Sequence, residues 1–213
     1  MEIKIYKKDF WLAILAGEIV AWLSLPTLKN IKIIDILYSF GINFNLFLSI
    51  WVIFVPLGAI GGLGAFYLIA RIKQRIGFFQ LGKYGVIGVL NTFLNAGVFN
   101  LLIFLTDVST GLIVDSFFVV AFVVTLMNSF LWNKFWAFEE RKIENIKKEM
   151  LQFSGISAGV ALINIAILHT VVNIIGAPIG IDSKIWANVG LVFTIIVAFS
   201  GNFFSYKYIV FKK

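Results

Sequence analysis

The sequence predicts an all-α polytopic membrane protein, a helical bundle of about six transmembrane helices. Of its 213 residues, 60% are hydrophobic and 14% are charged, and the mean hydropathy is +0.96. Such a chain has too little polar surface to cover a water-soluble fold. Its apolar runs reach the roughly 20 residues that a membrane-spanning helix needs, whereas barrel strands would show about 10 residues of alternating polarity.

Six apolar runs are predicted to span the membrane. In chain order they are residues 10–26, 46–70, 84–105, 116–136, 153–175 and 185–206. The first run has a basic start like a secretory signal, but Glu18 within it and the lack of a small-x-small cleavage site argue against removal. Residues 27–45 mix lysines with isoleucines, which predicts a short amphipathic helix at the outer interface. Residues 71–80 and 139–152 are expected to be cytoplasmic connectors.

Basic residues predict the orientation of the chain. If the first end is cytoplasmic, only Lys29, Lys32 and Lys184 fall on the outer side, which leaves 15 of the 18 Lys and Arg residues inside. This asymmetry follows the positive-inside rule. The net charge of +7 is therefore a topology signal, and no nucleic-acid partner is expected. We predict an integral protein of the cytoplasmic membrane of a prokaryote, with both termini in the cytoplasm.

An internal repeat relates the last four helices. Sliding the chain on itself by 73 residues brings identical residues together without a gap. The pairs are Gly82 and Gly155, Asn91 and Asn164, Asn100 and Asn173, Phe130 and Phe203, Lys134 and Lys207, and Phe138 and Phe211. The offset predicts two parallel-repeat hairpins, related by an axis along the membrane normal.

Catalysis by this chain alone is not expected. The sequence contains no cysteine and one histidine, so thiolate chemistry, histidine-rich metal sites and a Ser/His/Asp triad are all disfavoured. Residues 77–83 have the glycine and lysine spacing of a phosphate-binding loop. However, Tyr84 replaces the Ser or Thr that would hold magnesium, and no strand precedes the segment. We expect neither a metal nor a cofactor.

Glu18 is an ionisable residue inside the first span. It lies eight residues beyond Phe10, about 12 Å along the helix axis, so a charged form would be costly. Two interpretations stay open: a proton-coupling or cation-attracting site, and a neutral acid that bonds to a neighbouring helix.

Small residues one helical turn apart allow another helix to approach closely. Gly58 with Gly62, and Gly155 with Gly159, have this spacing. Packing within the chain is the commoner role of such pairs, and contact between copies in a homo-oligomer is the alternative.

Polar stripes mark the third and fourth spans. The third carries Gly88, Asn91, Thr92 and Asn95, and the fourth carries Thr125, Ser129, Trp132, Asn133 and Trp136. Asn91 lies about 12 Å above Lys83, and Ser129 about 8 Å above Lys134, which places both stripes in the inner half of the membrane. Interhelical hydrogen bonds of about 0.6 kcal/mol each could explain them. The alternative is a polar cleft rimmed by Lys83, Lys134 and Lys207 that accepts a lipid phosphate.

Three motifs resemble a known family. Residues 80–92, Gln-Leu-Gly-Lys-Tyr-Gly-Val-Ile-Gly-Val-Leu-Asn-Thr, resemble the opening of the GtrA-like family. Residues 128–138, Asn-Ser-Phe-Leu-Trp-Asn-Lys-Phe-Trp-Ala-Phe, resemble the end of its second helix, and residues 202–211 repeat that ending more loosely. The resemblance implies a GtrA-like four-helix transmembrane domain over residues 79–213. Residues 1–78 are then an additional N-terminal two-helix membrane extension.

The resemblance also implies a role in cell-surface polysaccharide synthesis, as a flippase that moves polyprenyl-phosphate-linked sugars across the membrane. Related domains are fused to polyprenyl-phosphate glycosyltransferases, including dolichol-phosphate mannose synthases. One alternative is therefore a non-catalytic membrane subunit that anchors a family 2-type glycosyltransferase. A second is a proton-coupled small-molecule exporter that uses Glu18.

Five residues are predicted to contact the lipid-linked sugar from the cytoplasmic leaflet. They are Lys83, Asn91, Asn133, Lys134 and Trp136. The lysines would bind the phosphate, the asparagines would face the sugar, and Trp136 would stack on a sugar face.

Overall fold

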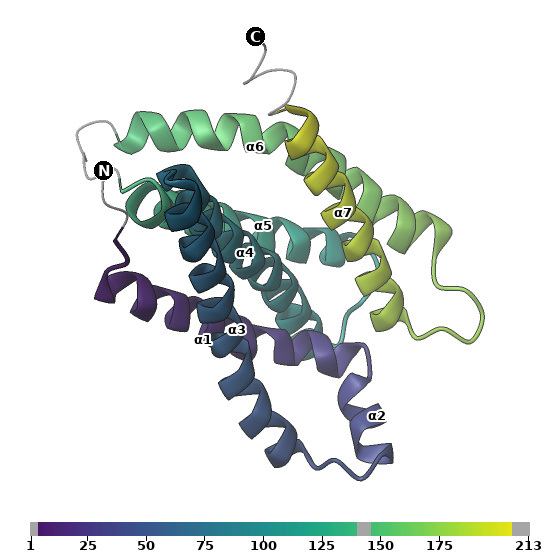
Figure 1. Cartoon of the computed structure of the whole chain (residues 1–213). Coiled ribbons are helices and arrows are strands. Elements are labelled where there is room, and N and C mark those ends of the chain that lie inside the picture. Colours follow the sequence, from purple (N-terminus) through teal and green to yellow (C-terminus); the bar gives the residue numbers. More distant parts are fainter. Residues whose placement is uncertain (1–3, 140–145, 206–213) are drawn as a thin grey trace.

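The computed structural model describes residues 4–139 and 146–205, without the side chains of residues 148, 152, 156 and 198–205. All regular secondary structure in the described part is helical (Figure 1). Its helices are α1 (Lys7–Asn30), α2 (Ile33–Ser39), α3 (Phe44–Lys73), α4 (Ile76–Thr106), α5 (Leu112–Trp132), α6 (Ile146–His169) and α7 (Ser183–Ser205). Two π-helical turns, η1 (Asn133–Ala137) and η2 (Thr170–Ile175), continue α5 and α6.

The predicted all-α membrane fold is confirmed. Five helical stretches are long and apolar enough to cross a bilayer: Lys7–Asn30, Phe44–Lys73, Ile76–Thr106, Leu112–Ala137 and Glu149–Ile175. The sixth predicted span corresponds to α7, whose apolar section Ser183–Val197 is shorter. Large apolar side chains such as Phe54 and Leu105 are two-thirds exposed, as expected of a surface that meets lipid rather than water.

Two connecting segments test the predicted boundaries. The amphipathic helix expected between the first two spans is α2, which buries Ile34. The connector predicted at residues 71–80 is shorter than expected, because α3 runs to Lys73 and α4 begins at Ile76. Gln74, in the left-handed region with φ +52°, ends α3 and lets the chain reverse within two residues.

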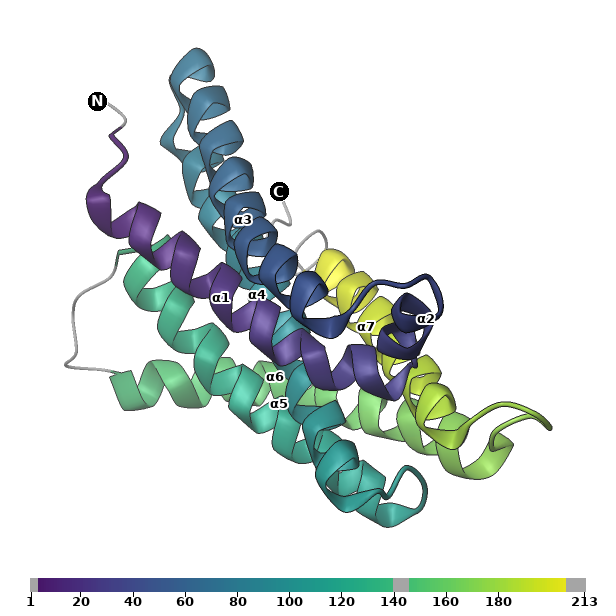
Figure 2. The ribbon, with the colours of Figure 1, turned by 90° about the horizontal axis from the view of Figure 1, so that it is seen from below.

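Close helix packing joins α1, α3 and α4, which lie alongside one another (Figure 2). A Cβ atom added to Gly17 would lie 2.4 Å from the Cα of Pro56, and one added to Gly97 would lie 2.4 Å from the carbonyl oxygen of Leu23. A Cβ added to Gly82 would lie 2.5 Å from the Cβ of Phe66. Glycine at these positions therefore lets the helices approach to a distance that no side chain would permit.

The glycine pairs predicted from spacing do not pack in this way. No described atom lies within 4 Å of a Cβ added to Gly58, Gly62, Gly155 or Gly159. Among the described residues, the expectation of close packing within the chain at these four glycines is therefore wrong. The spacing shows that two glycines share one face of a helix, but it does not show whether that face points toward another helix or toward lipid.

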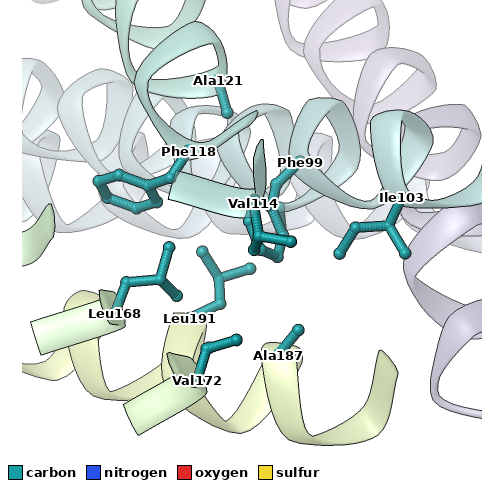
Figure 3. Packing of buried hydrophobic residues seen from close by; sticks show 10 residues of the cluster. Phe99, Ile103, Val114, Phe118, Ala121, Leu168, Val172, Ala187 and Leu191 are labelled. Atoms are coloured by element: carbon teal, nitrogen blue, oxygen red, sulfur yellow. The ribbon is translucent and has the colours of Figure 1, made fainter. Parts of the chain in front are cut away.

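The main buried core lies between the two C-terminal hairpins, the first formed by α4 and α5 and the second by α6 and α7 (Figure 3). Three pairs of its side chains are 73 residues apart in the sequence: Phe99 and Val172, Val114 and Ala187, and Phe118 and Leu191. Each hairpin thus contributes equivalent positions to a shared core, as expected of two repeats that face each other across an axis.

Two hydrogen-bonded residue pairs between the hairpins are reciprocal. Asn100 of the first hairpin bonds to Asn188 of the second, with nitrogen to oxygen distances of 2.8 Å. Asn173 of the second hairpin donates to Asp115 of the first, with a shortest distance of 3.3 Å. The 73-residue offset converts Asn100 into Asn173 and Asp115 into Asn188. This exchange is what a two-fold-like relation between the hairpins requires.

Candidate functional site

A buried ionic cluster joins three elements at the predicted cytoplasmic end of the bundle. Lys83 Nζ of α4 lies 2.8 Å from Asp9 Oδ1 of α1 and 2.9 Å from Glu139 Oε1. Trp136 Nε1 of η1 donates to the same Asp9 oxygen at 3.0 Å. Asp9 is fully buried and Lys83 is 3% exposed. Lys8, 3.1 Å from Glu139, balances the second carboxylate, so the cluster pairs two anions with two cations.

The pKa of the Glu139 carboxyl is held below its ordinary value of 4.5, first by the hydrogen bond from Lys83 and further by Lys8. Because the folded-state pKa is depressed, the stabilisation from Glu139 is complete above pH 4.5 and is lost as the pH falls through the folded-state value. We therefore expect the thermal midpoint to fall on acidification below pH 4.5, and to fall less in Glu139→Gln. Unfolding scans in detergent would check this, and equal acid sensitivity of both proteins would contradict it.

Lys134 forms a second buried ion pair. It is 6% exposed and contacts Glu149 in the first turn of α6. Lys134, Asn133 and Trp136 all lie in η1, where the Phe138 backbone N–H donates to the Asn133 carbonyl at 2.9 Å. Such π-helical turns within α-helices are frequent at functional sites.

The two predicted asparagines lie in different surroundings. Asn91 Oδ1 accepts a hydrogen bond from Asn128 Nδ2 at 2.8 Å, which links α4 to α5. Asn133 Nδ2 donates to the Ser129 carbonyl at 2.9 Å, within its own helix. Asn133 Oδ1 is buried and has no hydrogen-bond partner among the described residues, and the same holds for Thr125 Oγ1 two turns earlier. These two atoms leave hydrogen-bonding capacity in α5 and η1.

The structure brings together only part of the predicted site. Lys83 and Trp136 share the Asp9 cluster, with Lys83 Nζ 3.5 Å from the Trp136 carbonyl oxygen. Asn91 is held elsewhere by Asn128, and Lys207 lies outside the described residues. Two apolar grooves formed by the described residues are lined by neither Asn133 nor Lys134. The predicted polar cleft therefore stays a prediction.

Polar clusters also occupy the opposite end of the bundle. Asn30 Nδ2 of α1 donates at 2.9 Å to the Asn100 side chain, which also bonds to Asn188. His169 Nδ1 lies 2.7 Å from Asp115 Oδ2. These side-chain contacts connect α1 and both hairpins at the predicted outer end of the bundle.

Three carboxylates of the site were missed from the sequence. Asp9 precedes the first predicted span, and Glu139 and Glu149 lie in the predicted connector 139–152. The position of Asp9 in the first turn of a helix could have indicated that it is ordered. An acid there normally accepts hydrogen bonds from backbone N–H groups, and Asp9 accepts one from Tyr6 at 3.0 Å. Glu18 has no hydrogen bond or ion pair with any described residue.

A family model supplies the remaining observation. The model described as GtrA/DPMS, transmembrane domain, matches residues 83–211, which is more than half of the chain. The chain belongs to this family. Neither a curated protein nor a solved structure matches the chain significantly. The GtrA/DPMS family is linked to polysaccharide and glycoconjugate synthesis, and the matched region holds Lys83, all of η1 and both C-terminal hairpins.

Proposed function

We propose that this GtrA/DPMS-type protein carries polyprenyl-phosphate-linked sugars across the membrane during polysaccharide or glycoconjugate synthesis. The proposed substrate contacts are Lys83, Asn91, Asn133, Lys134 and Trp136, of which Asn91 is held apart from the others by Asn128. Family membership supports the class of substrate. The two ion pairs between a buried lysine and a partly exposed glutamate support binding of the phosphate at the lysines.

Each buried lysine is paired with a glutamate that remains accessible. The side chains of Glu139 and Glu149 are 40% and 39% exposed, whereas those of Lys83 and Lys134 are 4% and 5% exposed. A buried ammonium needs an anionic partner, but an exposed carboxylate can move into water at little cost. An arriving lipid phosphate can therefore replace a glutamate on the lysine, with charge-assisted hydrogen bonds of comparable strength.

Lys134 is the lysine that accepts the phosphate more readily. Lys83 has Asp9 as a second, fully buried partner, which stays in place if Glu139 leaves. Lys134 has one carboxylate partner among the described residues, Glu149. Asn133 Oδ1, next to Lys134 in η1, and Thr125 Oγ1, two turns earlier in α5, can bond to sugar hydroxyls.

The test is transbilayer movement of a short-chain polyprenyl-phosphate sugar in vesicles that contain the purified protein. Lys134→Ala should reduce the rate about tenfold or more, because a charge-assisted hydrogen bond to phosphate is lost. Glu149→Gln should lower the lipid concentration needed for half the maximal rate, since the competing carboxylate is removed. Lys147→Ala is the matched control, because Lys147 is an exposed lysine in the first turn of α6.

Movement that is unchanged in Lys134→Ala would overturn the proposed site. Binding to a polyprenyl-phosphate glycosyltransferase without any movement would favour the anchoring subunit instead. Glu18→Gln distinguishes the proton-coupled exporter from the lipid translocase. Loss of pH-driven export of a small molecule, with lipid movement intact, would favour the exporter.

A further inference from the structure

We propose that a groove between α1, α3 and α4 holds the polyprenyl chain of the lipid-linked sugar while its phosphate is at the lysines. This inference rests on the proposed function and names the part of the protein that binds the lipid tail. The groove is about 400 Å³ in volume and is lined by twelve residues, none of them charged or polar.

Three glycines keep the groove open. Gly58 and Gly62 of α3 and Gly85 of α4 line it, and no described atom lies within 4 Å of a Cβ added to any of them. All three glycines are exposed. The groove is therefore reached from the lipid-facing side of the bundle. Gly58 and Gly62, which make no close contact with another described helix, thus border a space that a ligand can enter.

The lining of the groove suits a hydrocarbon chain. Its wall on α3 runs from Val55 to Phe66, a length of about 16 Å at the helical rise per residue. A flexible apolar chain can lie along this length and contact only apolar side chains and glycines.

Basic residues at one end of the groove favour a lipid whose phosphate head group lies at that end. The groove reaches Gly82, which precedes Lys83 in α4, and Phe66, five residues before Arg71 in α3. Arg71, Lys73 and Arg75 are exposed at this end and form no ion pair with a described residue. A lipid phosphate at this end of the bundle would thus leave its tail beside the apolar groove.

Most of the groove depends on the N-terminal extension. Its α1 and α3 walls come from residues before 83, outside the region that the family model matches. The extension therefore adds a tail-binding surface to the family domain. This assignment gives the first two transmembrane helices a role in substrate binding rather than in anchoring alone.

The test fills the groove with larger side chains and measures binding of the polyprenyl chain. Full-length protein in vesicles is labelled with a polyprenyl phosphate that carries a photoreactive group in its chain. In Gly58→Leu/Gly62→Leu, labelling should fall about tenfold or more, because two leucines occupy the space of the chain. Gly61→Leu/Gly64→Leu is the matched control: these glycines lie in the same helix, also have no described atom within 4 Å of an added Cβ, and do not line the groove.

Equal labelling of the filled variant and the control would overturn the inference. Labelling that an excess of phosphatidylglycerol removes and unlabelled polyprenyl phosphate does not would also overturn it, in favour of ordinary bilayer lipid. The outcome is separable from the proposed function. Groove-dependent labelling without sugar-lipid movement would defeat translocation alone, whereas movement with groove-independent labelling would defeat the groove alone.

Discussion

Replacing Lys83 with methionine is expected to destabilise the protein by about 3–5 kcal/mol, the typical cost of removing one partner of a buried ion pair. Asp9 is fully buried, and Lys83 is its only cationic contact among the described residues. Without Lys83 the Asp9 carboxylate keeps hydrogen bonds from Tyr6 and Trp136 but has no counter-charge. Thermal unfolding in detergent at a fixed scan rate would measure the loss.

A second substitution tests the cause. Asp9→Asn in the Lys83→Met background removes the unpaired charge and should recover most of the lost stability. Lys73→Met is the control, because Lys73 is exposed and its loss should change the midpoint little. A midpoint for Lys83→Met equal to that of the unmodified protein would show that the cluster does not stabilise the bundle.

Replacing Gly97 with alanine is expected to cost about 1–3 kcal/mol, the usual range for overpacking. The added Cβ would lie 2.4 Å from the Leu23 carbonyl oxygen, and a backbone atom cannot move aside without displacing α1 from α4. Alanine is the better helix former by about 1 kcal/mol, so a net loss must come from the helix contact. The midpoint of thermal unfolding would report it.

Gly61→Ala is the matched control for this substitution. No described atom lies within 4 Å of a Cβ added to Gly61, so alanine there should leave the midpoint unchanged or raise it. If Gly97→Ala behaved like Gly61→Ala, α1 would not be packed against α4 as closely as the structure describes. The extension would then be more loosely attached to the family domain.

Much of the candidate site could be predicted from local motifs. Lys83 lies in the first family motif, and Lys134 and Trp136 lie in the second, so the sequence locates both ends of the hairpin formed by α4 and α5. Their partners could not be predicted. Asp9 is 74 residues from Lys83, and only the packing of α1 against α4 brings them to 2.8 Å. A carboxylate at the edge of an apolar run looks the same whether it meets water or a buried ammonium.

The lipid environment of this protein, its helices and the 73-residue repeat can all be predicted from the amino-acid order. They follow from run length, composition and order, which are local properties of the chain. Tertiary contacts are needed to show that Gly97 packs against α1 while Gly62 borders an open groove. In a soluble protein, polarity marks the outward face of a helix. In a membrane, lipid and protein interior are equally apolar, so hydropathy cannot distinguish the face that packs from the face that binds.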